Sequence, residues 1–208
     1  LGAELIEQGE DFQAAREHAV RLAGERGAHM VPSFHADLVR GVATYWVEFF
    51  ASFATGEAPE VVFVPIGLGS GICACAAARA FAGVRTRIVG VVSAHAPAYR
   101  LSFEAGRAIE APVSTQLADG MACRVPEPQA LAIIQREVDE IVSVSDDEVA
   151  AAMRALFADT HNVAEGAGAA ALAALLQQSE RWAGRRVGLS LSGGNVDSAQ
   201  FARVLAAA

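Results

Sequence analysis

Short, continuous runs of hydrophobic residues alternate along this chain with longer segments in which hydrophobic residues return every three or four positions. The continuous runs are typical of strands buried in a sheet, and the longer spacing is typical of helices. These patterns predict strands at Ala3–Ile6, His29–Val31, Val61–Val64, Thr86–Val92, Glu140–Val144 and Arg186–Leu191. They predict helices at Phe12–Arg26, Asp37–Phe53, Ile72–Ala82, Ala96–Ala105, Ala130–Glu137, Asp146–Ala158, Ala164–Gln178 and Ser198–Ala207.

The alternation of strands and helices predicts an α/β fold, in which a mostly parallel twisted sheet carries helices on both faces. Ser145 and the three acidic residues after it predict a capped helix start, because a serine oxygen and negative charge both stabilise a helix N-terminus. The segment Asp37–Phe53 is apolar almost all round, which predicts a helix buried between layers.

The most informative stretch is Val61–Cys75, where a hydrophobic run is followed by the glycine-rich loop Gly67–Gly71 and a helix of small residues. Glycines let backbone N–H groups approach a bound group closely, and the helix N-terminus adds partial positive charge. The stretch therefore predicts a phosphate-binding loop. The alternative is an ordinary strand-to-helix turn that binds nothing.

The residues around this loop disfavour a nucleotide as the bound phosphate. The Walker pattern requires a lysine, and all 16 basic residues of this chain are arginine. The dinucleotide pattern requires glycine where Ile72 stands and an acidic residue after the next strand, where Ser93–His95 stands. A small phosphorylated cofactor is the interpretation that remains.

A second cluster of small residues, Ser192–Gly194, follows the last predicted strand. Ligands in parallel α/β sheets bind at the carboxyl ends of the strands. If the strands that precede Gly67–Gly71 and Ser192–Gly194 are neighbours in the sheet, one ligand could contact both segments. The alternative interpretation of Ser192–Gly194 is a tight turn.

Composition restricts the classes of partner. The net charge of −8 argues against nucleic acid, and no apolar run reaches the length of a membrane span. The three cysteines, Cys73, Cys75 and Cys123, show no repeating spacing, which indicates free thiols in a reducing compartment and hence a cytoplasmic protein. Cys73 and Cys75 are better explained by core packing than by zinc.

Four motifs in the same order and spacing resemble the fold-type II pyridoxal-phosphate enzymes, most of all the threonine and serine dehydratases and the serine racemases. The motifs are VPIGLGSGI, ADGMACRVP, VAEGAGAAALAALL and LSGGNVD. The segments LGAELIEQGEDFQAA and LVRGVATYWVEFF agree with the same family, so the resemblance covers the whole chain. It implies that this chain is the C-terminal portion of such an enzyme and that the N-terminal part is missing.

The resemblance implies pyridoxal 5′-phosphate as the cofactor and assigns binding roles to seven residues. The backbone of the glycine loop would hold the phosphate, a serine would hydrogen-bond the pyridine nitrogen, and an acid would lie near the ring. In that order they are Gly67, Leu68, Gly69, Ser70, Gly71, Ser192 and Glu165. Glu165 has an alternative role as an acid in a helix first turn.

Two departures from the family limit what this chain holds. The family attaches its cofactor through a lysine that also acts as general base, and this chain has no lysine. We therefore predict no catalytic residue within the chain. Serine-racemase-like members place acidic metal ligands after the second strand, where Val91–Ala98 carries no carboxylate, so we predict no metal site there.

The resemblance divides the chain into residues 1–40, the tail of a smaller N-terminal domain, and residues 41–208, a larger cofactor domain. It implies a dehydratase (ammonia-lyase) that converts threonine, serine or a related β-hydroxy amino acid to a 2-oxo acid and ammonia. It also implies a small amino-acid substrate and a homo-oligomer. The alternatives are a racemase of the same fold, a lysine-free remnant that binds a phosphate ligand or a partner protein, and a nucleotide-binding domain.

Overall fold

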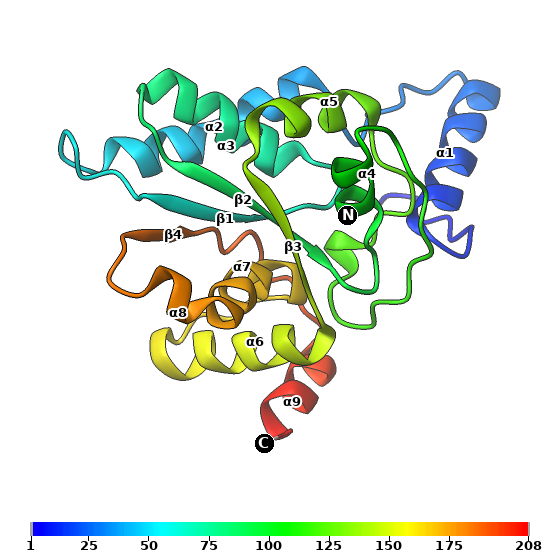
Figure 1. Ribbon diagram of the computed structural model, residues 1–208. Helices are drawn as coiled ribbons and strands as arrows, with labels where there is room; N and C mark the ends of the chain where they lie inside the picture. The colour runs from blue at the N-terminus through cyan, green and yellow to red at the C-terminus, as the bar shows by residue number, and fades with distance from the viewer. Residues whose placement is uncertain (1, 208) are drawn as a thin grey trace.

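The computed structural model describes residues 2–207, and its centre is a four-stranded parallel sheet with the strand order β3-β2-β1-β4 (Figure 1). The strands are β1 (Val61–Pro65), β2 (Arg87–Ser93), β3 (Glu140–Val144) and β4 (Val187–Leu189). All three pairings between neighbouring strands are parallel. The predicted α/β fold with a parallel sheet is thus confirmed.

Helices cover both faces of this sheet, α2, α3 and α5 on one side and α6, α7 and α8 on the other (Figure 1). The helices are α1 (Phe12–Arg26), α2 (Ala36–Ala51), α3 (Ser70–Ala82), α4 (Ala98–Ala105), α5 (Pro128–Glu137), α6 (Asp146–Thr160), α7 (Gly166–Gln177), α8 (Ser179–Trp182) and α9 (Ser198–Ala206), with a 3-10 turn, η1, at Asp119–Met121. The short elements α8 and η1 were not predicted from the pattern.

The central strand β1 divides the hydrophobic core into two layers. Val62 and Val64 pack with α2, α3 and α5, whereas Val61 and Phe63 pack with α6 and α7. All four side chains are at most 1% exposed. This alternation is what a strand buried on both faces requires, because successive side chains point to opposite faces of a sheet.

β1 is also the strand that brings the two glycine-rich segments together. It pairs with β4 in a parallel register that sets Val61 opposite Val187 and Phe63 opposite Leu189. The carboxyl ends of β1 and β4 therefore lie side by side, and each leads into one of the two predicted ligand-binding segments. The expectation that these strands are neighbours is confirmed.

The predicted start of α6 is confirmed in detail. The Ser145 side chain accepts a hydrogen bond from the Glu148 N–H (3.3 Å), and the Glu148 carboxylate accepts one from the Ser145 N–H (2.7 Å). This reciprocal pair is the capping box, which satisfies two backbone donors that a helix start leaves free.

Three predictions about the first 53 residues were wrong. Ala3–Ile6 and His29–Val31 form no strand in the described chain, because neither segment lies along a sheet edge that could supply hydrogen bonds. The helix α2 is not buried between layers: it packs one face on α3, and only Trp46 and Phe50 are buried. Its other apolar residues are at least partly exposed.

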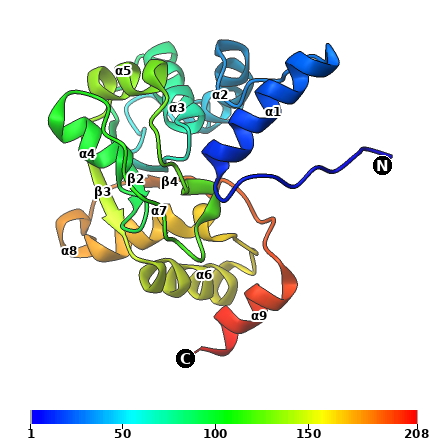
Figure 2. The ribbon, with the colours of Figure 1, turned by 90° about the vertical axis from the view of Figure 1, so that its right-hand side faces the viewer.

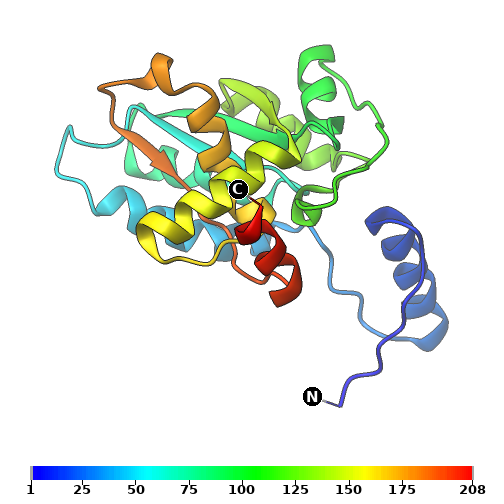
Figure 3. The same ribbon diagram turned by 90° about the horizontal axis from the view of Figure 1, so that it is seen from below.

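The helix α1 lies at the edge of the molecule, and the segment before it extends away from the sheet (Figures 2 and 3). None of the residues of α1 is buried. Among residues 2–207, no helix combines the length and apolar character that crossing a bilayer requires.

Candidate functional site

The glycine-rich loop connects β1 to α3 and presents a row of free backbone donors. Gly69 is the N-cap of α3, at a φ of 99° that disfavours any side chain, and a Cβ there would lie 2.7 Å from Ala130 Cβ. Within residues 2–207, the N–H groups of Leu68–Gly71 donate to no protein acceptor. Free N–H groups at a helix N-terminus form a site for an anion.

Two aromatic side chains hold the carbonyl groups of this loop from outside. The Tyr99 hydroxyl donates to the Leu68 carbonyl (2.8 Å) and accepts from the Glu127 N–H (3.0 Å). The Trp46 indole N–H donates to the Gly71 carbonyl (3.2 Å). With the carbonyls held on one side, the loop N–H groups stay available on the other.

Tyr99 and Trp46 have roles that the sequence pattern did not predict. Both residues are 1% exposed, and a buried Tyr or Trp needs a partner for its polar atom. That rule indicates that each side chain has a hydrogen-bond partner but does not identify the partner, because Tyr99 and Leu68 are 31 residues apart in the chain. Burial raises the pKa of Tyr99, so its phenol stays protonated and able to donate.

A cavity of about 420 Å³ lies at the carboxyl ends of β1 and β4, beneath α2. It brings together the five predicted binding residues of the glycine loop and Ser192, and none of its described lining residues carries a charge. Its lining is Val42, Tyr45, Val64, Pro65, Gly67, Leu68, Gly69, Ser70, Gly71, Gly120, Met121, Ala167, Ser190, Leu191 and Ser192. One bound molecule can therefore contact both glycine-rich segments.

A second cavity of about 310 Å³ adjoins the first, since the two share Gly67, Leu68, Ser70 and Gly120. The carbonyl of Gly120 approaches Gly67 so closely that a Cβ on Gly67 would lie 2.3 Å from it. Within the described part of the chain, Asp119 is the one charged side chain that lines this second cavity. The glycine at position 67 is thus required by the close approach of another backbone segment.

The seventh predicted residue, Glu165, lies behind the Ser192–Gly194 turn. Its backbone N–H donates to the Gly193 carbonyl (3.1 Å), and a Cβ on Gly193 would lie 2.5 Å from the Glu165 carboxylate. Glu165 is the N-cap of α7 and is absent from the described lining of both cavities. Its predicted position beside a bound ring therefore stays a prediction.

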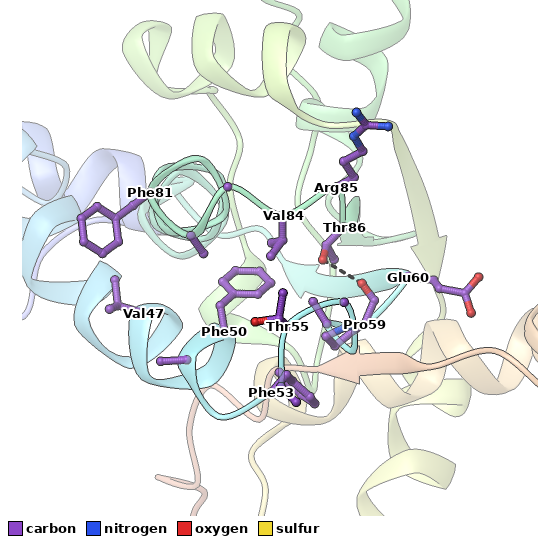
Figure 4. A pocket seen from close by; sticks show the side chains of 16 residues that line it. Val47, Phe50, Phe53, Thr55, Pro59, Glu60, Phe81, Val84, Arg85 and Thr86 are labelled. Atoms are coloured by element: carbon purple, nitrogen blue, oxygen red, sulfur yellow. Dashed lines mark hydrogen bonds between the residues drawn. The ribbon is translucent and has the colours of Figure 1, made fainter.

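A larger cavity of about 650 Å³ lies at the opposite ends of the strands (Figure 4). Pro59 and Glu60 line it just before β1, and Thr86 lines it just before β2, where its hydroxyl donates to the Pro59 carbonyl (2.7 Å). Ligands of parallel sheets bind at the carboxyl ends of strands, so size alone does not make this cavity the site.

The three cysteines are free thiols, as their spacing predicted, and all three are buried, as core packing predicted for Cys73 and Cys75. Burial raises the pKa of Cys73 to about 12 and that of Cys123 to about 11. The thiols therefore stay protonated at neutral pH, and a thiol is a poor nucleophile compared with a thiolate. Among residues 2–207, no three His, Cys, Asp or Glu side chains lie together in a way that could hold a metal ion.

Comparison with known proteins identifies the family. The sequence family described as pyridoxal-phosphate dependent enzyme matches residues 1–193. The chain belongs to this family. The resemblance found in its motifs is thereby confirmed, and with it pyridoxal phosphate as the cofactor of the family.

Two enzymes named L-threonine ammonia-lyase are similar to this chain in sequence. L-threonine ammonia-lyase of Geobacter sulfurreducens is 38% identical over 94% of this chain and 48% of the relative. L-threonine ammonia-lyase of Thermotoga maritima is 32% identical over 99% of this chain and 50% of the relative. The chain spans about half the length of the curated relatives it matches.

Solved structures agree with the sequence comparison. The threonine deaminase described as from T.th. superposes with a TM-score of 0.84 at 32% identity, over 94% of this chain and 64% of that one. Maize serine racemase superposes with a TM-score of 0.82 at 24% identity, over 97% of this chain and 62% of that one. The latter similarity shows a shared fold.

The described residues fit the phosphate and ring of pyridoxal phosphate. The free N–H groups of Leu68–Gly71 suit a phosphate, and Ser192 lines the same cavity. The Ser190 hydroxyl, which also borders this cavity, is buried without a hydrogen-bond partner among the described residues. The chain has no lysine, so it offers no side chain for covalent attachment of the cofactor.

Proposed function

We propose that the protein containing this chain is a pyridoxal-phosphate-dependent ammonia-lyase acting on threonine, serine or a related β-hydroxy amino acid. The observation that carries the proposal is the glycine loop with free N–H groups that shares one cavity with Ser192 at the neighbouring strand end. Relatives named L-threonine ammonia-lyase support the choice of reaction. The products would be a 2-oxo acid and ammonia.

The residues of this chain bind and orient the cofactor in the proposed reaction. Pyridoxal phosphate supplies an electron sink that weakens bonds at the α-carbon of an amino acid. The loop Gly67–Gly71 would hold the phosphate through its backbone N–H groups, and the hydrogen bonds from Tyr99 and Trp46 would keep that loop in shape. Ser192 would offer a neutral hydroxyl, and not a carboxylate, to the ring nitrogen; this would favour the unprotonated ring, a weaker electron sink that suits β-elimination.

The division into two domains forms part of the proposal. Residues 1–40 would be the tail of a smaller domain and residues 41–208 the cofactor domain, with α2 crossing the boundary. In support, α1 leaves Phe12 45% and Val20 51% exposed, whereas the buried residues of the two core layers all lie at or after Trp46. Apolar residues on α1 would then pack on the rest of the smaller domain.

Cytoplasmic location and a homo-oligomeric state complete the proposal. Three free, buried thiols suit a reducing compartment. Light scattering of the purified full-length protein measures the oligomeric state, and a monomer at working concentration would contradict that part.

The activity test uses the full-length gene product, loaded with pyridoxal phosphate and offered L-threonine, L-serine and other β-hydroxy amino acids. We expect release of a 2-oxo acid and ammonia in equal amounts. Interconversion of enantiomers without 2-oxo acid would indicate the racemase instead. Saturable cofactor binding with neither activity would indicate a non-catalytic protein, and tight binding of NAD or ATP would indicate a nucleotide-binding domain.

A matched pair of glycine variants ties the activity to the loop. Gly67→Ala should lower cofactor affinity at least about tenfold, because its Cβ would lie 2.3 Å from the Gly120 carbonyl and displace the loop. Gly41→Ala on α2, where a Cβ meets nothing within 4 Å, should leave affinity unchanged. Equal affinity in both variants would show that the cofactor binds elsewhere.

A further inference from the structure

The hydroxyl of Ser190 is buried but makes no hydrogen bond to the described residues. Ser190 is 7% exposed, and within residues 2–207 its Oγ is the one buried side-chain nitrogen or oxygen that has no hydrogen-bond partner. Burying a hydroxyl without a partner costs stability, so each such group in a natural protein requires an explanation. A ligand that supplies the partner is one explanation that the surroundings of Ser190 can test.

The strand register places the Ser190 side chain on the cavity side of the sheet. Val62 pairs with Gly188 and Phe63 with Leu189, so Ser190 lies beside Val64 at the next step. A Cβ on Gly188 would meet Phe49 of α2 and Val62, so a side chain at position 188 would point toward α2. Side chains two positions apart in a strand share a face, so Ser190 faces α2 as well.

The cavity of about 420 Å³ opens on this same side. Val42 and Tyr45 of α2 and Val64 of β1 line it together with Ser190. The residues next to Ser190, Leu189 and Leu191, are apolar, and an alanine at position 190 would occupy the place without an unsatisfied polar atom. Packing alone therefore gives no reason for a hydroxyl at this position.

We propose that Ser190 is a cofactor-binding residue whose hydroxyl finds its missing hydrogen-bond partner in the pyridoxal phosphate bound in this cavity. The strand end of β4 would then present two hydroxyl groups to the cofactor, from Ser190 and Ser192. This inference rests on the proposed function, because it assumes that the cavity binds this cofactor.

The test separates binding from folding in the full-length protein. Ser190→Ala and wild type are compared for thermal stability without cofactor and for affinity toward 4′-deoxypyridoxine 5′-phosphate, an analogue that lacks the aldehyde and cannot bond to a lysine. Without cofactor, the variant should be as stable as wild type or more stable, since it loses an unsatisfied hydroxyl. Its affinity for the analogue should fall about 3- to 10-fold, the effect of one lost hydrogen bond.

Ser102→Ala is the matched control. Ser102 is fully buried, and its hydroxyl donates to the Ala98 carbonyl (2.7 Å) and accepts from the Ile109 N–H (2.8 Å), away from the cavity. This variant should lose stability with and without cofactor and bind the analogue as wild type does. Ser190→Cys, which keeps a weak donor, should fall between wild type and Ser190→Ala in affinity.

The outcomes separate this inference from the proposed function. If wild type binds the analogue and Ser190→Ala binds it equally well, the role of Ser190 is refuted while the proposed function stands. If Ser190→Ala destabilises the cofactor-free protein as much as Ser102→Ala does, Ser190 has an internal partner and the inference is also refuted. If wild type does not bind the analogue, the proposed function fails and this inference fails with it.

Discussion

The helices α1 and α7 have opposite environments although alanine is common in both. They have 15 and 12 residues, yet α1 has no buried residue whereas α7 buries eight. The eight are Gly166, Ala167, Gly168, Ala169, Ala170, Ala171, Ala173 and Ala174. The presence of alanine alone therefore does not decide burial.

Close approach explains the environment of α7. A Cβ on Gly166 would lie 2.1 Å from the Leu117 carbonyl, and one on Gly168 would lie 2.2 Å from the Gly193 carbonyl. The small residues of α7 thus let the helix support both the segment before Asp119 and the Ser192–Gly194 turn. The proposed cofactor site is therefore supported from below by this helix.

Whereas α7 is held by close packing, α1 is connected by ion pairs to the segment between η1 and α5. Arg124 pairs with the Asp11 carboxylate at the N-cap of α1, and Arg16 pairs with Glu127 (3.7 Å). Glu127 is also the residue whose N–H donates to Tyr99. One helix is therefore part of the packed core beneath the sheet, whereas the other is attached at the surface and keeps apolar residues exposed.

The largest expected effect comes from adding one methyl group to α7. Gly168→Ala should destabilise the protein by about 3 kcal/mol, because the new Cβ would overlap backbone that cannot move without shifting the Ser192–Gly194 turn. Urea denaturation measures the change. A loss below about 1 kcal/mol would show that α7 is less tightly packed than its contacts indicate.

The second-largest expected effect is a loss of stability in the glycine loop that follows β1. Tyr99→Phe removes the hydroxyl that donates to Leu68 and accepts from Glu127, so it should cost about 2 kcal/mol and loosen the glycine loop. Cofactor affinity should fall with stability. Unchanged affinity for pyridoxal phosphate, measured by fluorescence titration, would contradict a role for Tyr99 in shaping the loop.

For α1, Arg124→Gln should weaken the attachment of the helix and leave the core around the sheet intact. The variant loses the ion pair with Asp11, so trypsin should cleave faster within α1, at Arg21 or Arg26. High salt should raise the cleavage rate of wild type toward that of the variant, because salt screens exposed ion pairs. A change in the unfolding midpoint of the whole protein as large as that of Gly168→Ala would refute the contrast between the two helices.

The same pair predicts a pH dependence. The Arg124 guanidinium, which hydrogen-bonds Asp11, holds the pKa of that carboxyl below its usual range. A lowered folded-state pKa stabilises α1 docking above about pH 4, where an unfolded aspartate is ionised, and this stabilisation is lost as the pH falls through the lowered value. Pepsin cleavage before and within α1 should rise over that acidic range in wild type, and Asp11→Asn should abolish the dependence.

The smallest effect is a gain. Gly24→Ala in α1 places a methyl group where nothing lies within 4 Å, so it should stabilise the helix by about 0.5–1 kcal/mol through backbone entropy. Circular dichroism during urea denaturation records the change. If the gain appears in the transition of the whole protein, α1 unfolds together with the core around the sheet; if it appears in a separate transition, α1 unfolds by itself.

Local pattern in the sequence determined a large part of this fold. The periodicity predicted α1 and β3 with the bounds they have, the Ser145 cap of α6, and the strand, loop and helix around Gly67–Gly71. Each of these depends on residues close together in the chain. The family motifs added the cofactor, since they encode backbone shapes that only a few residue types permit.

Only the tertiary structure decided which segments meet. The pairing of β1 with β4, the hydrogen bond from Tyr99 to Leu68 and the unpartnered hydroxyl of Ser190 within the described residues each depend on parts far apart in the chain. The strands expected at Ala3–Ile6 and His29–Val31 are absent from the described structure for the same reason. A short segment becomes a strand, a contact or a binding group only when a distant part of the chain supplies its hydrogen-bond partner.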